Sequence, residues 1–242
     1  MSIETSEIDS TQQAADGLNV AEQAVGRARL VVDEVRATIA SALRVLDDAE
    51  LDSAKARLSE RGDFYLGAAG EHLDRLQTRC TDAQHLIHAI YGHLELAAEA
   101  VQRVTTMFVN SDTPPLSDSS DLWNLATRIS VFDEMVALAK PLSRTATRHL
   151  DGACQASRSI SRPALLEPVT MERTIAAAGK EFGRADEDVR LLGDVIDRAA
   201  ASAKDAAGLA NEITDNARRR MAGQGRAPVP DCTAPATSRA AR

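Results

Sequence analysis

A seven-residue repeat of small and apolar residues constrains this chain more than any other feature of its sequence. In such a repeat the first and fourth positions, called a and d, face a neighbouring helix, and the other positions face solvent. The first run of a and d positions extends from Leu18 to Ala49, and the second extends from Leu66 to Phe108. Most residues between these positions are charged or polar, as an exposed helix face requires. The repeat therefore predicts long helices that pack side by side.

Two further runs complete the pattern. The third extends from Leu122 to Ile160 and the fourth from Met171 to Ala217. Pro141 lies inside the third run, where proline normally ends or kinks a helix. The repeat keeps its phase across Pro141, so we predict one kinked helix rather than two helices. Residues 161–168 have the composition of a turn.

These runs predict an all-α fold, in which long antiparallel coiled-coil helices form an up-down-up-down four-helix bundle built from two helical hairpins. A single bundle is favoured over an extended rod because both hairpins are equally hydrophobic. The predicted organisation is a helical hairpin over 1–109, a Pro/Ser/Asp linker over 110–120, a second hairpin over 121–221 kinked at Pro141, and a disordered tail over 222–242.

The first hairpin turn has two candidate positions. Residues 47–52 are rich in acidic residues and are followed by Ser53, which can cap a helix. Residues 61–63 contain Gly62, a flexible point, followed by Asp63 as a second possible cap. The phase of the repeat slips between Leu46 and Leu66. We favour 47–52, because Ala54, Leu58, Gly62 and Leu66 still follow a helical stripe.

Composition narrows the range of functions. The 242 residues include 43 Ala and only 7 aromatic residues. Alanine at a and d positions brings helices close together, and scarce aromatic residues argue against the wide core of a sandwich, barrel or doubly wound sheet. A narrow helical seam leaves no cavity for a small-molecule substrate. The sequence also lacks phosphate-binding loops and hydrolase or metalloprotease motifs. We therefore expect no enzyme activity, no catalytic residue and no cofactor.

The balance of charge bears on partners. Asp and Glu number 36 against 28 Lys and Arg, which gives a net charge of −8. An acidic chain is a poor general binder of nucleic acid or of anionic membranes. Arg218, Arg219 and Arg220 form a basic cluster that could contact either partner. Cations are also favoured by the dipole at the carboxyl end of a helix, which explains the cluster without any ligand.

Histidine and acidic residues give no clear site. His85 and His88 are three residues apart on a polar helix face, but a metal site needs ligands from another element. We interpret the pair as a solvated surface and predict no metal site. His149 is expected to find its hydrogen-bond partners locally. An acid-rich stretch contains Glu181, Asp186, Glu187 and Asp188, which we interpret as solvated surface because they lie on opposite helix faces with arginines nearby.

Cys80, Cys154 and Cys232 are far apart in the sequence and lack metal-ligand spacing, which favours a reducing compartment. Cys80 holds an a position and should behave as a small buried hydrophobe. The amino-terminal segment has neither a basic region nor an apolar one, so no signal peptide is expected. We expect a cytoplasmic protein, or else one exported without a cleaved signal peptide.

One short pattern resembles a known family. Tyr91 and Glu95, near the end of the second predicted helix, match the YxxxD/E export signal. With the long helical hairpin, this pattern resembles the substrates of type VII (ESX) secretion of the WXG100 class. The resemblance implies that the secretion machinery would recognise Tyr91 and Glu95. The WxG turn of that class is missing, since Trp123 is followed by Asn124 and Leu125.

A sustained helical repeat without chemical motifs is typical of a protein that works through its surface. We expect a non-enzymatic interaction or scaffold protein, with a protein partner or self-association through its helices. One alternative is a helical effector or structural protein exported by a type VII system. A second alternative is an amphipathic bundle that lies on a membrane surface, although its apolar stripes lack Trp or Lys borders.

Overall fold

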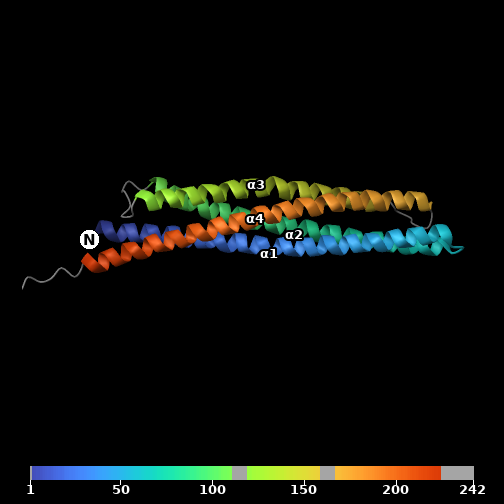
Figure 1. Cartoon of the computed structure of the whole chain (residues 1–242), viewed down its shortest axis with the longest axis horizontal. Coiled ribbons are helices and arrows are strands. Elements are labelled where there is room, and N and C mark those ends of the chain that lie inside the picture. The colour runs from blue at the N-terminus through green and yellow to red at the C-terminus, as the bar shows by residue number, and fades with distance from the viewer. Residues whose placement is uncertain (1, 111–118, 159–166, 225–242) are drawn as a thin grey trace, which may run out of the picture.

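The computed structural model describes residues 2–110, 119–158 and 167–224. The described chain forms four helices: α1 (Ser2–Leu58), α2 (Gly62–Asn110), α3 (Ser119–Arg158) and α4 (Pro168–Gln224). Figure 1 shows that the four helices run along one common axis and that successive helices reverse direction. Helix α1 has 57 residues, which corresponds to about 85 Å at the helical rise of ~1.5 Å per residue. The described residues include no strand, and the all-α four-helix bundle is confirmed.

The four helices pack as a closed ring of neighbours. Helix α1 packs against α2 and α4, and α3 packs against α4 and, less extensively, against α2. Polar contacts at the two ends of the α1–α4 pair show that these helices are antiparallel. Arg57 donates to Glu172 at 2.9 Å, and Arg218 donates to Gln12 at 2.7 Å. The two hairpins therefore form one bundle and not a rod.

The core consists of the residues that the heptad repeat assigns to a and d. Every such residue whose side chain the structure describes is buried, from Leu18 in α1 to Ala217 in α4. Phe108, Leu122 and Ile160 belong to the same predicted stripes but lie outside the described side chains. Alanine allows close packing, with Ala21, Ala28, Ala42 and Ala49 all fully buried in α1 alone. The core is therefore narrow.

The favoured position of the first hairpin turn is wrong. Helix α1 continues through residues 47–52 to Leu58, and α2 begins at Gly62, close to the alternative position. The reason is that the heptad of α1 continues past Ala49. Ser53 and Ala56 occupy the next core positions and are buried, whereas Leu58, part of the stripe on which the prediction rested, is 91 % exposed.

Polar contacts within the observed turn define where the two helices end and begin. The backbone N–H of Arg61 donates to Ser59 Oγ at 3.1 Å. The carbonyl of Arg61 accepts the N–H groups of Phe64 and Tyr65, which starts α2. Ser53, interpreted from the sequence as a cap, is a small core residue instead.

The remaining predicted boundaries concern the ends of α2, α3 and α4. Helix α3 begins two residues before the predicted position 121 and runs without a break through Pro141 to Arg158. Helix α4 extends three residues past the predicted end at 221. Residues 111–118 of the predicted linker, 161–166 of the predicted turn and 225–242 of the predicted tail lie outside the described residues. Within the described residues, no helix combines the length and the apolar character needed to cross a membrane.

Candidate interaction groove

The seam between α2 and α3 is the least extensively packed of the four neighbouring pairs. Two open cavities lie along it, with volumes of about 380 Å³ and about 490 Å³, so the expectation of a seam without a cavity is wrong for this helix pair. We call the surface that lines them the α2–α3 groove. Its residues are Ile87, His88, Tyr91, Glu95, Ala98, Glu99, Gln102 and Arg103 from α2 and Lys140, Ser143, Arg144, Thr147 and Arg148 from α3.

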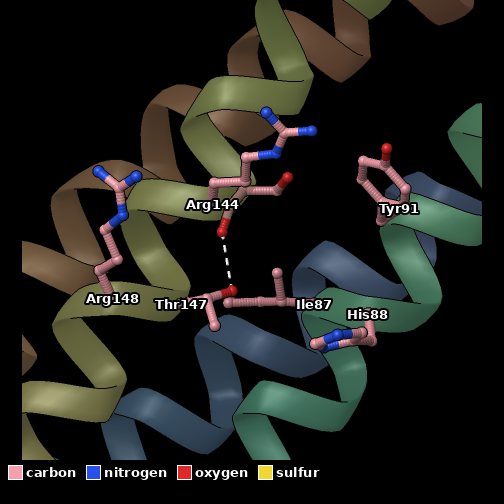
Figure 2. Close-up of a pocket in the computed structure, with 7 residues that line it drawn as sticks. Ile87, His88, Tyr91, Arg144, Thr147 and Arg148 are labelled. Carbon is pink, nitrogen blue, oxygen red and sulfur yellow. Dashed lines mark hydrogen bonds between the residues drawn. The ribbon is translucent and has the colours of Figure 1, made fainter.

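The smaller cavity has an apolar floor and polar walls. Ile87 is 2 % exposed and forms the floor, and the partly buried ring of Tyr91 stands at one side (Figure 2). Thr147 Oγ1 donates to the carbonyl of Ser143 at 2.9 Å, as the dashed line in Figure 2 shows. Ser143 Oγ donates in turn to the carbonyl of Lys140 at 2.8 Å. The hydrogen atoms of both hydroxyl groups are therefore donated to backbone carbonyls of α3, and neither hydroxyl is free to donate to a ligand.

The side chains of this cavity that remain available to bind a ligand are cationic or aromatic. Arg144 is exposed and has no hydrogen-bond or ion-pair partner among the residues that the structure describes. Figure 2 shows its guanidinium extending toward the side of the groove where Tyr91 stands, whereas the guanidinium of Arg148 points away from Tyr91. His88 Nδ1 donates to the carbonyl of Gln84 at 3.2 Å, so its Nε2 is the nitrogen left for other contacts.

The two cavities meet where Lys140 crosses the seam. Lys140 Nζ lies 5.8 Å from the centroid of the Tyr91 ring, within the range of a cation–π interaction. Lys140 also lines the larger cavity, together with Glu95, Glu99 and Arg103. Arg103 lies 3.8 Å from Glu99, so these two charges partly balance each other. The groove is therefore cationic at its Arg144 end and of mixed charge at its Glu95 end.

The structure brings the two residues of the predicted export signal into this groove. Tyr91 lines the smaller cavity and Glu95 the larger one, one helical turn further along α2. Glu95 is exposed, and Tyr91 is partly covered by Lys140. The sequence pattern places both residues on one face of a helix. It does not indicate that α3 supplies the opposite wall.

The other predicted site residues are dispersed. Arg218, Arg219 and Arg220 are exposed near the end of α4, where Arg218 contacts Asp215 at 3.6 Å as well as Gln12. His85 and His88 are exposed, in agreement with a solvated face. No group of three or more His, Cys, Asp or Glu side chains within the described ranges is arranged to hold a metal ion.

Sequence reasoning missed one polar cluster between α3 and α4. The expectation that His149 finds local partners is wrong, because its Nδ1 donates to Glu181 of α4 at 2.7 Å. Its Nε2 lies 3.6 Å from Asp188 Oδ2, a buried oxygen without a hydrogen bond. The hydrogen bond from His149, assisted by Arg184 and Lys180, lowers the pKa of Glu181.

The spacing of seven residues between Glu181 and Asp188 is the signal that could have revealed this cluster. It places both carboxylates on one face of α4, which faces α3. Their side chains are only 25 % and 17 % exposed, so the prediction of a solvated surface is wrong for these two residues.

The comparisons with known proteins give little. No family model matches the chain, and no curated protein matches it either. Among solved structures, the chain is similar to the SmhB pore of the tripartite alpha-pore forming toxin Smh from Serratia marcescens. The TM-score is 0.26 and the identity 9 %, over 90 % of this chain and 86 % of that one. A likeness at this TM-score carries no argument about function.

Proposed function

We propose that the protein is a non-enzymatic interaction module that binds an acidic, amphipathic helix of a protein partner in the α2–α3 groove. The observation that carries the proposal is the free guanidinium of Arg144, which extends toward the side of the cavity where Tyr91 stands. Elsewhere in the bundle, arginines such as Arg57 and Arg128 reach carboxylates on neighbouring helices. Arg144 has no such carboxylate within the described chain, and a partner would supply it.

The form of the groove supports a helical partner. Its two cavities follow each other along the seam between two antiparallel helices, so an elongated ligand fits better than a compact one. Helix-in-groove recognition uses anchors one helical turn apart, and Tyr and Arg are the residues most enriched among the energetic anchors of interfaces. On α3, Arg144 extends toward the Tyr91 side of the groove and would contact a carboxylate of the partner, whereas Arg148, one turn further along, points away from that side.

The proposal of a non-enzymatic role rests on the chemistry of the described residues. The hydroxyls of Ser143 and Thr147 donate to backbone carbonyls, so neither is held as a nucleophile. His149 contacts two carboxylates, and no hydroxyl or thiol donor to it is present among its described contacts. Catalysis of group transfer needs a nucleophile within hydrogen-bond reach of a base. These arrangements suit binding better than reaction.

Binding of two synthetic peptides tests this proposal. One is an amphipathic helical peptide with glutamates one turn apart, and the other has lysines in their place. Fluorescence anisotropy should detect binding of the glutamate peptide, with an affinity that falls as salt is added. Arg144→Glu should weaken this binding by about tenfold or more, because an attraction becomes a repulsion.

Arg219→Glu is the matched control, since it places the same charge change in the basic cluster at the end of α4. Arg219→Glu should change the affinity by no more than about twofold. Its charge lies near the end of α4, further from Arg144 than the Debye length of ~10 Å, so salt screens it from the carboxylate that Arg144 would contact. Absence of binding, equal binding of both peptides, or a larger loss with Arg219→Glu than with Arg144→Glu would each reject the groove as the site.

Type VII export is the second candidate, and it is supported by the position of Tyr91 and Glu95 on the two successive cavities of one groove. A secretion machinery that reads this pair would have to reach into the groove beside Lys140. Replacing both residues by alanine should then abolish secretion from a type VII-competent host while circular dichroism still reports a folded bundle. Unchanged secretion of that variant would remove this candidate.

A further inference from the structure

Two cysteines far apart in the sequence lie opposite each other in the core of the α2–α3 seam. Cys80 of α2 is 0 % exposed, and Cys154 of α3 is 4 % exposed. The register of the seam is set by Gln84, which donates to Asp151 at 2.6 Å. Cys80 lies one turn before Gln84 in α2, and Cys154 lies one turn after Asp151 in α3. Because the two helices are antiparallel, these steps run in the same direction along the seam, so the two cysteines are at the same level. Both residues are free thiols in this structure.

Local interactions agree with that register. Gln84 is only 4 residues from Cys80, and Asp151 only 3 from Cys154, so the hydrogen bond between Gln84 and Asp151 holds the two cysteine positions level across the seam. Burial, together with the neighbouring Cys154, raises the pKa of the Cys80 thiol. The positive charge of Arg158, one turn beyond Cys154, acts on the pKa of Cys80 in the opposite direction and lowers it. Two buried thiols at the same level of one helix seam are a different arrangement from single buried cysteines.

We propose that Cys80 and Cys154 are an oxidation site, at which a low-molecular-weight disulfide converts the thiol pair into a disulfide that joins the two hairpins. The α2–α3 seam is the least extensively packed of the bundle, so a covalent bond has more effect there than elsewhere. The bond would hold α2 and α3 together two helical turns from Ile87 and Thr147 of the groove.

The reaction proceeds in two exchanges. The thiolate of one cysteine attacks a sulfur of the oxidant RSSR, which forms a mixed disulfide and releases RS⁻, protonated to RSH. The thiolate of the second cysteine then attacks the protein sulfur of the mixed disulfide. The Cys80–Cys154 bond forms, and a second RSH leaves. The pair loses two electrons and two protons, and RSSR is reduced to two RSH.

Refolding in a glutathione buffer tests the proposal without requiring the oxidant to reach a folded core. The full chain carries Cys232→Ser, so that only the two core cysteines remain. After refolding in oxidised glutathione, mass spectrometry should find a peptide pair linked through Cys80 and Cys154, with a loss of two hydrogen atoms. The oxidised monomer should melt about 4–15 °C higher than the reduced one, because the bond restricts the unfolded chain.

Two further variants separate this disulfide from other thiol chemistry. Cys80→Ala and Cys154→Ala, each in the Cys232→Ser chain, retain one core thiol and should show no oxidation-dependent change in melting temperature. Two variants are used because either substitution alone could impair folding. The proposal is overturned if both thiols remain free after oxidative refolding, if glutathione stays bound to either cysteine, or if the product is a covalent dimer.

Discussion

At the scale of single residues, the most informative case is His149. Its neighbour Leu150 is fully buried, and the sequence around it gives no hint of a distant partner. The fold places it against Glu181 and Asp188, residues of another helix. A heptad repeat states which residues turn inward. The repeat does not indicate which helices are neighbours or how they are aligned along their length. Polar pairs between helices depend on both.

This contact makes the stability of the bundle depend on pH. The pKa of Glu181 is lowered below its ordinary value of 4.5 by the hydrogen bond from His149. A lowered pKa in the folded state means that the carboxylate stabilises the bundle above the ordinary value, and that this contribution is lost as pH falls through the lowered one. Glu181→Gln should reduce the free energy of unfolding by on the order of 1 kcal/mol at neutral pH, because the site is partly exposed.

The difference between the wild type and Glu181→Gln should shrink as the pH falls from about 5 to about 3, as measured by urea denaturation. The exposed Glu212 on the same helix offers a control, and Glu212→Gln should not produce this convergence. A difference that stays constant over that pH range would show that Glu181 contributes through packing and not through its charge.

At the scale of elements, α3 is notable because a proline lies in the middle of it. Pro141 lacks the N–H that would bond to the carbonyl of Ala137, yet the helix runs from Ser119 to Arg158. Pro141 is exposed, while its neighbours Ala139 and Ser143 are buried. The buried a and d residues of α3 before and after Pro141 pack against the neighbouring helices, and this packing keeps the helix continuous. The preserved heptad phase predicts this continuity, and a bend at Pro141 stays a prediction.

Pro141→Ala should therefore stabilise the protein. The substitution restores a backbone hydrogen bond and removes the clash of the ring with the preceding turn, which should add about 1–3 kcal/mol to the free energy of unfolding. Chemical denaturation measures this directly. Gln155→Ala, at another exposed position of α3, should change stability by less than about 0.5 kcal/mol. A loss of stability in Pro141→Ala would mean that the ring makes packing contacts worth more than the missing bond.

The first hairpin shows where reasoning from elements fails. Acidic residues and a serine at 47–53 have the composition of a helix boundary, and the apparent stripe from Ala54 to Leu66 favoured a new helix after them. The free energy of burial decides otherwise, because Ser53 and Ala56 continue the stripe that packs on the neighbouring helices. Local capping preferences are worth about 1 kcal/mol, and an extended packed stripe outweighs them.

At the scale of the whole molecule, the two hairpins depend on each other. Helix α4 packs along α1 as well as along α3, and contacts such as Arg57–Glu172 and Arg218–Gln12 join the hairpins at both ends. Separating the hairpins would expose the inner faces of all four helices to water. The buried apolar residues of all four described helices belong to one hydrophobic core.

Unfolding should consequently be a single cooperative transition. In differential scanning calorimetry of the Cys232→Ser chain, the calorimetric and van't Hoff enthalpies should agree to within about 10 %. Circular dichroism at the same heating rate should give the same midpoint. Two resolved transitions, or a calorimetric enthalpy well above the van't Hoff value, would show that the hairpins unfold independently.

The sequence by itself determined which residues form the core and that the core is narrow and helical, because heptad position and side-chain size act locally along each helix. It also placed Tyr91 and Glu95 on one helix face. Only the tertiary structure decided that α3 packs beside α2. That packing forms the α2–α3 groove around Arg144 and places Cys80 and Cys154 at the same level of the seam. The physical reason is that pairing and register between helices depend on interactions summed over the whole bundle, which no single stretch of sequence contains.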